Sequence, residues 1–393
     1  MYQRNQYLMY AVSFLSGLHF FGAVMVPFFA DWGGIGDFQI FMLQTWFIVW
    51  SGILEVPTGA VADRFGRKFS VCLGLFISGI GFTVYVSAPS IYVFLLGEFI
   101  LALALALISG ANMALLSDSL ASNGLAESRT RIFGRVRAFS LLGMVAGTPL
   151  GSLIAARYGL PIPFYATTVS SGLALLVAFW LIEPPVVKKR KTYLEILSTG
   201  LKTVWQIPSV RWLTLDYVIV AAISFMMVWL YQFVLGDVGI PIVYFGFVHM
   251  ASVSLESLVM HTLGTLEDRL GFRRLARLFV AASIVGFTLA AVGVVTQTPW
   301  LAIVGIITGI GIGLARQDLM VANIDQYLES SERATSLSTL RLIRNLAVAV
   351  LYLVVGAGIE VSLTWTLLGL SASLLVYLIT TRHSSTFILD LPK

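Results

Sequence analysis

The fold of this chain is decided by the stretch Gly59-Ala-Val-Ala-Asp63-Arg64-Phe-Gly66-Arg67-Lys68 and by a second copy of its pattern. The second copy begins 205 residues later and reads Gly264-Thr-Leu-Glu-Asp268-Arg269-Leu-Gly271-Phe-Arg. Each copy follows a long apolar segment, and the two glycines, the aspartate and the arginine occupy the same places in both. Such a matched pair indicates a chain built from two similar halves.

The composition excludes a soluble protein. Of the 393 residues, 58% are hydrophobic and 11% are charged, whereas about 25% are charged in an ordinary soluble domain. At roughly 20 residues per transmembrane helix, the apolar runs fit twelve spans. These lie near 7–29, 39–62, 69–88, 91–117, 132–156, 163–183, 211–235, 242–264, 275–296, 300–323, 337–358 and 362–381. We therefore expect an all-α membrane protein.

Charge predicts the orientation of these spans. All of the 25 lysines and arginines except Arg157 fall in or near the two termini, the central break and the loops on the same side. The positive-inside rule places that side, with both termini, in the cytoplasm. The net charge of +5 then belongs to the inner membrane face and indicates no nucleic-acid partner. Short outer loops without an N-x-[ST] sequon favour a prokaryotic plasma (inner) membrane.

Several kinds of chemistry have no signature here. The single cysteine, Cys72, lies in an apolar run, and the four histidines form no H-E-x-x-H helix. The chain contains neither a G-x-x-x-x-G-K-[ST] loop nor a G-x-S-x-G elbow. We therefore expect no metal, no cofactor and no enzyme active site.

The only long polar break runs from 184 to 210, opening with Pro184-Pro185 and continuing with Lys188-Lys189-Arg190-Lys191. It predicts a six-helix bundle at 1–186, a cytoplasmic linker at 187–210 and a second six-helix bundle at 211–393. The linker either lies along the anionic inner leaflet or is a solvated tether.

The stretch 59–68 closely resembles the G-x-x-x-D-R-x-G-R-K signature between the second and third helices of major facilitator superfamily transporters. The resemblance covers the whole chain: twelve spans, a six-plus-six duplication, a cytoplasmic linker and a weaker second copy of the signature. It implies two six-helix bundles around a central cavity that opens alternately to either side of the membrane.

The signature implies an inner gate. Gly59 and Asp63 lie four residues apart and share a helix face, where a small residue allows another helix to approach. By resemblance, Asp63 faces the start of the eleventh helix, and Arg67 bridges Asp63 and Asp118, the acid that ends the fourth helix. Together these residues latch the gate while the protein faces outward.

The other signature residues have plainer expected roles. Arg64, Gly66 and Lys68 shape the loop, although simple positive-inside topology also accounts for the arginine and the lysine. In the second copy, Phe272 replaces the latching arginine. Gly264, Asp268, Arg269 and Gly271 are therefore expected either to form a second latch or to serve structure only.

Two acids inside the membrane are candidates for proton coupling, because a charge at mid-bilayer needs a partner or a cavity. Glu98 lies in the fourth helix, which lines the cavity in this family, and is expected to bind a proton or cation; the alternative is a side chain that reaches the outer surface. Glu55 precedes Asp63 by two turns and is either a proton site or a gate partner of Arg341 or Arg344.

The tenth helix carries a polar patch, Arg316-Gln317-Asp318. Arg316 is expected either to bind an anionic substrate or to pair with Asp318 or with an acid across the cavity. His19, flanked by Phe20 and Phe21, suits an aromatic or cationic ligand but also fits a hydrogen-bonded core residue. Asp216, near the start of the seventh helix, is expected to end in water.

The fifth helix carries Gly143-x-x-x-Gly147-Thr148-Pro149-Leu-Gly151, which resembles the G-x-x-x-G-P-x-x-G-G motif of drug:proton antiporters with the proline displaced by one residue. Its small residues are expected to pack against the eighth helix. The resemblance points to export rather than uptake.

These features predict a monomeric, proton-coupled secondary transporter in contact with membrane lipid, which exports small amphipathic molecules by alternating access. One alternative is a proton-coupled symporter for a small organic anion or sugar, favoured if Arg316 contacts the substrate. Alternatives of other classes are a passive channel and a membrane receptor or scaffold that does not transport.

Overall fold

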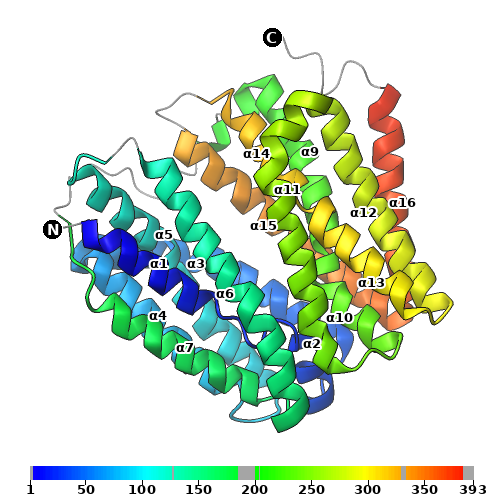
Figure 1. The fold of residues 1–393 in the computed structure, drawn as a ribbon, viewed down its shortest axis with the longest axis horizontal. Coiled ribbons are helices and arrows are strands. Elements are labelled where there is room, and N and C mark those ends of the chain that lie inside the picture. Colours follow the sequence, from blue (N-terminus) through cyan, green and yellow to red (C-terminus); the bar gives the residue numbers. More distant parts are fainter. Residues whose placement is uncertain (1–2, 126–127, 185–199, 203, 329–332, 384–393) are drawn as a thin grey trace. The chain divides into compact units, whose positions relative to one another are not determined.

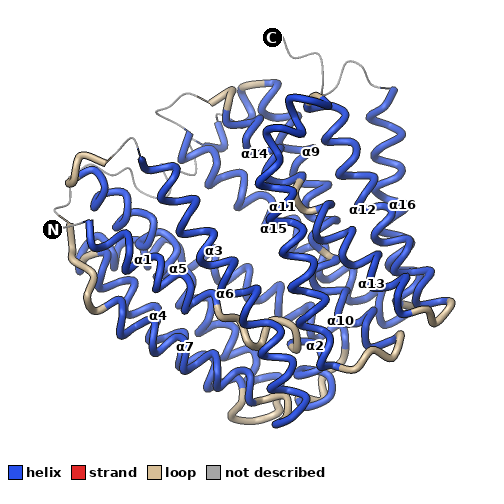
Figure 2. Tube along the Cα trace, viewed as in Figure 1, coloured by secondary structure: helices blue, strands red, loops and turns tan. Residues whose placement is uncertain are grey.

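The computed structural model describes residues 3–125, 128–184, 200–202, 204–328 and 333–383, and the regular elements in these ranges are all helical (Figures 1 and 2). Contacts divide the chain into two units. Unit 1 consists of residues 1–190 and 242–250, and unit 2 of residues 191–241 and 251–393. The predicted linker falls largely on 185–199, outside the described residues.

Unit 1 contains the helices of the first predicted bundle. They are α1 (Gln3–Gly17), α2 (Met25–Pro27), the π-helical turn η1 (Phe28–Trp32), α3 (Asp37–Phe65), α4 (Arg67–Tyr85), α5 (Ile91–Ala121), α6 (Arg129–Tyr158) and α7 (Ile162–Ala178). The short 3₁₀ turn η3 (Ile242–Tyr244) also packs on α6 in this unit. Helix α11 (Phe245–Leu270) starts here and continues into unit 2.

Unit 2 contains the remaining helices. They are α9 (Pro208–Phe225), α10 (Met227–Asp237), α12 (Phe272–Val295), α13 (Pro299–Thr308), the π-helical turn η4 (Gly309–Gly313), α14 (Arg316–Asp325), α15 (Arg333–Val361) and α16 (Leu363–His383). The seventh and tenth predicted spans are thus each assembled from consecutive helical pieces, α9 with α10 and α13 with η4 and α14.

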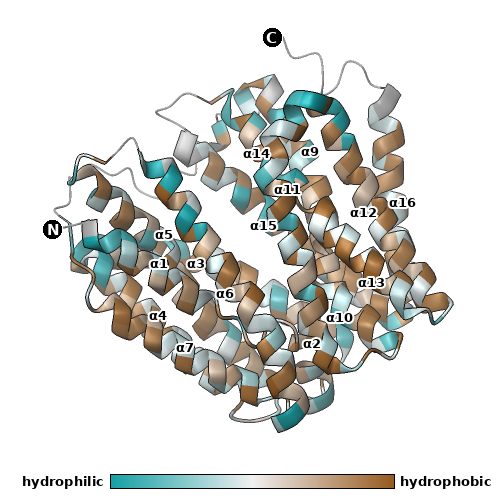
Figure 3. Cartoon of the chain, viewed as in Figure 1, coloured by the Kyte–Doolittle hydropathy of each residue, from teal (hydrophilic) through white to brown (hydrophobic). Residues whose placement is uncertain are grey.

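Within the described residues, ten helices are long and apolar enough to cross a membrane, and α7 is a shorter apolar helix. Their outward sides carry apolar side chains such as Val169 and Val354, exposed by 62% and 61%. Figure 3 shows brown, hydrophobic residues along these helices and teal residues at the turn between α11 and α12. Exposing such apolar surfaces to water is unfavourable, so we expect them to face the lipid of a membrane.

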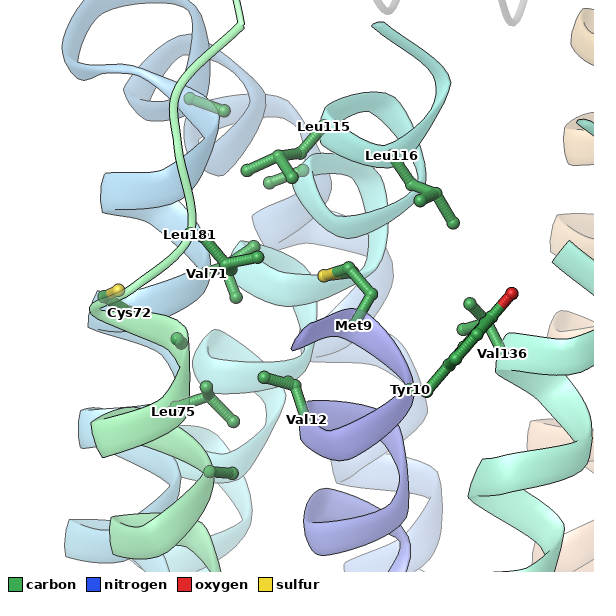
Figure 4. Close-up of a cluster of buried hydrophobic side chains, with 14 of the residues drawn as sticks. Met9, Tyr10, Val12, Val71, Cys72, Leu75, Leu115, Leu116, Val136 and Leu181 are labelled. Carbon is green, nitrogen blue, oxygen red and sulfur yellow. The ribbon is translucent and has the colours of Figure 1, made fainter. Parts of the chain in front are cut away.

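A core of interlocking apolar side chains holds unit 1 together at the end where the chain begins (Figure 4). Met9 and Val12 of α1 pack there with Val71 and Leu75 of α4. Cys72 belongs to the same cluster, with a free thiol. Burying such a side chain stabilises the fold by about 1.5–3 kcal/mol relative to exposing it to water. The gain relative to exposing it to lipid is much smaller.

The first span departs from the prediction. We expected one helix over 7–29, but α1 ends at Gly17 and residues 18–24 form turns. The N–H groups of His19 and Phe20 bond only two residues back, to the carbonyls of Gly17 (2.8 Å) and Leu18 (3.0 Å). The prediction of a continuous helix is wrong here. Pro27, which has no N–H to donate, is the last residue of α2, and the chain continues from it into the π-helical turn η1.

Candidate functional site

The signature loop is a sharp junction between two helices. α3 ends at Phe65 and α4 begins at Arg67, with Gly66 between them at φ +99°. Side chains disfavour this left-handed region, and glycine adopts it readily. The glycine therefore turns the chain directly from one helix into the next, and this places Arg67 in the first turn of α4.

The structure brings Arg67 and Asp118 together. The Arg67 side chain is buried and reaches α5, where it forms an ion pair with the Asp118 carboxylate. Its Nη1 also donates a hydrogen bond to the Ala114 carbonyl oxygen at 2.7 Å. This geometry ties the start of α4 to the end of α5 within unit 1. Charge-assisted contacts of this kind are stronger than neutral hydrogen bonds.

Glu183 is a third member of this cluster that sequence reasoning missed. Its carboxylate accepts hydrogen bonds from the backbone N–H groups of Arg67 (2.8 Å) and Lys68 (2.6 Å). These are among the N–H groups that the first turn of a helix leaves without an intrahelical partner. A carboxylate there also interacts favourably with the helix dipole. The one local signal is an acid directly before Pro184-Pro185.

The remaining signature residues lie on the surface of unit 1. The side chains of Asp63 and Arg64 are exposed, and Lys68 is half-buried. Arg64 places its guanidinium 5.5 Å from the centre of the Phe65 ring. A Cβ added at Gly59 would meet nothing within 4 Å among the described residues. Gly59, Asp63 and Arg64 therefore lie together on the last two turns of α3.

The second copy repeats the backbone turn of the first, and a different side-chain contact is described beside it. Gly271 has φ +77° and joins α11 to α12 as Gly66 joins α3 to α4. Gly264, Asp268 and Arg269 are exposed. The link to the neighbouring helix instead runs from the Asn323 amide to the Glu267 carboxylate, at 3.1 Å.

Glu98 is buried inside unit 1, with only 3% of its surface exposed. Its Oε1 accepts a hydrogen bond from the Gln44 amide of α3 at 2.9 Å. The fully buried Tyr85 packs against the adjacent Gly97. The structure thus places this carboxyl group between α3, α4 and α5. The expected alternative, a side chain extending to the outer surface, does not occur.

Glu55 occupies a different environment on α3. It is partly buried, two turns before Asp63 and two residues before Pro57, which lies inside the helix. The Thr58 hydroxyl donates a hydrogen bond to the carbonyl oxygen of Leu54 at 2.7 Å, close to the point where the proline interrupts the backbone hydrogen bonds of the helix. Glu55 and Glu98 are therefore separate sites on unit 1.

His19 lies in the turns that interrupt the first span. Its ring centre is 5.5 Å from that of Phe21, which in turn packs on Phe82 and Phe164. Irregular backbone at membrane depth occurs where protein buries it or where it lines a water-filled space. His19 and Phe21 thus lie in the irregular segment 18–24 of the first span.

The glycines of α6 face this irregular segment. A Cβ added at Gly143, Gly147 or Gly151 would collide with backbone atoms of Phe14, Leu18 or Phe20, respectively. The expected packing against the eighth span is present only in part: Gly246 of α11 approaches Thr148 and Ser152. The first span is the main neighbour of the glycines, because its interrupted backbone allows close approach.

In unit 2, Arg316 pairs with an acid of another helix, Asp216, which the sequence had not singled out as its partner. Its Nη2 donates to the Asp216 carboxylate of α9 at 2.5 Å, and both side chains are about 95% buried or more. Two expectations are corrected: the partner is not Asp318, which is exposed, and Asp216 does not end in water. The physical reason for the pair is that each side chain is charged and buried, and a buried charge is stable only beside an opposite charge.

Gln317 contacts a different arginine. Its Oε1 accepts a hydrogen bond from Arg344 of α15 at 2.9 Å, and the Arg344 guanidinium lies 5.4 Å from the centre of the Phe225 ring. The polar patch of the tenth span is therefore divided between two sides of α14.

This arrangement of helices and motifs matches a known family. The Major Facilitator Superfamily model matches residues 7–352. The chain belongs to the major facilitator superfamily. It is accordingly an all-helical, multi-pass membrane transporter.

Other members of the superfamily resemble the chain to different extents. The tetracycline resistance protein, class G, of Vibrio anguillarum is 25% identical over 74% of this chain and 72% of its own length. An uncharacterized transporter of Buchnera aphidicola is 34% identical, but the match covers 39% of this chain and only 36% of that protein. An MFS-type transporter of Methanocaldococcus jannaschii is 20% identical over 79% of each chain.

Solved structures of the superfamily share the fold. The nucleoside transporter NupG superposes with a TM-score of 0.78 at 14% identity, covering 96% of this chain and 98% of that one. A D-xylose-proton symporter gives 0.74 at 14% identity, with 97% and 98% covered. At such low identity these matches establish the architecture alone.

Proposed function

We propose that this transporter exports small amphipathic molecules in exchange for protons, by alternating access. The observation that carries the proposal is Glu98. Its carboxyl group is buried and hydrogen-bonded to a neutral amide, and no lysine or arginine forms an ion pair with it among the described residues. An ionised carboxylate there has no countercharge, so taking up and releasing a proton is a natural reaction of this group.

Export is supported by the relatives. Tetracycline resistance proteins of classes C, E and G match parts of the chain. A transporter that confers resistance must keep the compound from its target, and export does this. The glycines of α6, which resemble an antiporter motif, favour the same direction. The Arg316–Asp216 pair weighs against the symport of an anion, because the arginine already has a buried partner.

The gate belongs to the same proposal. We assign Asp63, Arg67 and Asp118 to a latch at the inner end of unit 1, with the basic side of the protein in the cytoplasm. Glu55, on the same helix as Asp63, is a second coupling candidate or a partner of the gate arginines. His19 and its aromatic neighbours are candidates for contact with the substrate.

The test uses purified protein in proteoliposomes with a trapped pH dye. A panel of lipophilic cations, sugars and organic anions is added under an imposed proton gradient. Proton movement that depends on substrate, in the direction opposite to substrate flux, is expected. Proton movement in the same direction as the substrate would show symport instead of antiport. Substrate flux without proton movement would show that transport is not coupled to protons.

Glu98→Gln examines the coupling site itself. The amide keeps the size and hydrogen-bonding capacity of the side chain but cannot carry the proton. We expect the variant to lose gradient-driven transport and to retain substrate exchange. Glu360→Gln, which changes an exposed acid at the end of α15, is the matched control. Intact driven transport in Glu98→Gln would move the proton site elsewhere, with Glu55→Gln the next variant.

A further inference from the structure

We propose that a cavity in unit 2 binds the phosphate group of an anionic phospholipid. The cavity lies between α9, α12, α14 and α16, where α12 begins and α16 approaches its end. Its polar lining consists of Asp216, Arg273, Arg277, Arg316, Tyr377 and Thr381. This site is separate from Glu98 and from the latch residues Asp63, Arg67 and Asp118, which belong to unit 1.

The charge of the lining favours an anion. Three arginines face one carboxylate, that of Asp216, and this carboxylate is already engaged by Arg316. Arg273 and Arg277 lie one turn apart on α12 and are exposed. An anion between them would approach both guanidinium groups, and arginine is well suited to phosphate because it presents several donors in a planar fork.

A buried donor in the same cavity has no hydrogen-bond partner. Arg316 Nε is buried and unpaired among the described residues, while Nη2 of the same guanidinium is used by Asp216 and, at 3.4 Å, by the Tyr377 hydroxyl. Leaving such a donor without an acceptor is unfavourable, because the group loses its hydration and gains no hydrogen bond in return. A phosphate oxygen entering the cavity supplies the missing acceptor, directly or through a water molecule.

The surroundings favour a lipid over a free phosphate ion. Leu278 follows Arg277 on α12, and Ile379 follows Leu378 of the cavity on α16; both are 53% exposed. In a membrane such side chains face acyl chains. The cavity therefore joins a basic, polar interior to a lipid-facing apolar surface at a helix end, and basic pockets between transmembrane helices bind lipid head groups.

Native mass spectrometry of the full-length protein tests this site. The purified protein is titrated with phosphatidylglycerol, with phosphatidylcholine as the neutral lipid, and retained lipid is counted. We expect phosphatidylglycerol to be retained preferentially. Removing each cavity arginine should weaken retention roughly fivefold, first in Arg277→Gln and then in Arg273→Gln/Arg277→Gln. Arg274→Gln is the matched control, since this exposed neighbour does not line the cavity.

The outcomes are distinguishable. Equal loss in Arg274→Gln and Arg277→Gln would show diffuse attraction to basic loops and overturn the site, and so would unchanged retention in the double variant. In a competition experiment, inorganic phosphate could displace the bound lipid as effectively as a short-chain phosphatidylglycerol does. That result would show that the site binds a free anion and not a lipid. Thermal unfolding without added lipid checks that each variant is folded, and Arg277→Lys should keep part of the retention.

Discussion

At the scale of single residues, the Arg316–Asp216 pair illustrates what a buried charge requires. Arg316→Ala leaves the Asp216 carboxylate buried without its countercharge. We expect the free energy of unfolding to fall by about 3–5 kcal/mol, the range for breaking a buried pair by removing one partner. Denaturant or thermal unfolding in a mild detergent measures this loss.

The double variant Asp216→Asn/Arg316→Met separates the pair from its packing. It removes both charges and keeps similar volumes, so we expect a smaller loss than in Arg316→Ala alone. The single variants Asp216→Asn and Arg316→Met complete the cycle, and a loss in the double variant equal to the sum of their losses would show that the ion pair contributes nothing of its own.

The sequence predicted some of these residue contacts and not others. The resemblance to the family motif predicted the contact between Arg67 and Asp118, because the family pattern includes both positions. It did not reach Glu183, whose partners are backbone N–H groups more than a hundred residues away and leave no side-chain pattern to recognise. Asp216 was missed for a related reason: a charge near the end of a span looks exposed until the facing helix is known.

At the scale of elements, the contact between α6 and the first span gives a sharp prediction. Gly151→Ala places a methyl group against the backbone of Phe20. Overpacking of this kind lowers the free energy of unfolding by about 1–3 kcal/mol. Thermal unfolding of the detergent-solubilised variant measures the change.

Gly172→Ala on α7 is the matched control. Its added Cβ meets nothing within 4 Å among the described residues, so the better helix propensity of alanine should leave stability unchanged or raise it by about 0.5–1 kcal/mol. If both alanine variants behave alike, α6 does not depend on close approach at Gly151.

Apolar runs predicted where helices lie but not where they break. The run 7–29 is apolar apart from Ser13, Ser16 and His19, and hydropathy records only this composition. The interruption at 18–24 depends on which backbone N–H groups find acceptors, together with the glycines at 17 and 22 and Pro27. The π-helical turn at Gly309–Gly313 likewise lies inside an apolar run, and hydropathy does not reveal it.

At the scale of the whole molecule, the proposed latch governs access from the inner side. Asp63→Asn removes the charge that would interact with a facing helix terminus, an interaction of about 0.3–1 kcal/mol. We therefore expect the ratio of inward-open to outward-open states to rise roughly twofold to fivefold. Labelling of Ala60→Cys by an impermeant reagent from the inner side, in a Cys72→Ser background, reports this ratio.

The second copy of the signature supplies the control. Asp268→Asn makes the same chemical change where Phe272 stands in place of the latching arginine, and it should shift the ratio less. An unchanged labelling rate in Asp63→Asn, or equal changes in the two variants, would contradict the latch.

The repeat explains why the architecture could be predicted from the sequence. Gly66 and Gly271 both adopt left-handed backbone, so one short motif marked the same helix junction in each half. The side-chain contacts around these junctions differ, with Arg67 and Asp118 in one half and Glu267 and Asn323 in the other. The shared backbone geometry thus accompanies different described side-chain contacts in the two halves.

The interrupted first span also has an evolutionary consequence. The turns at 18–24 pack directly against the glycines of α6. A change in only one of them would therefore leave either a steric clash or a void. Among relatives of this chain, the positions of Gly147, Gly151, Leu18 and Phe20 should covary. A lineage that regains a continuous first helix should then accept larger residues on α6.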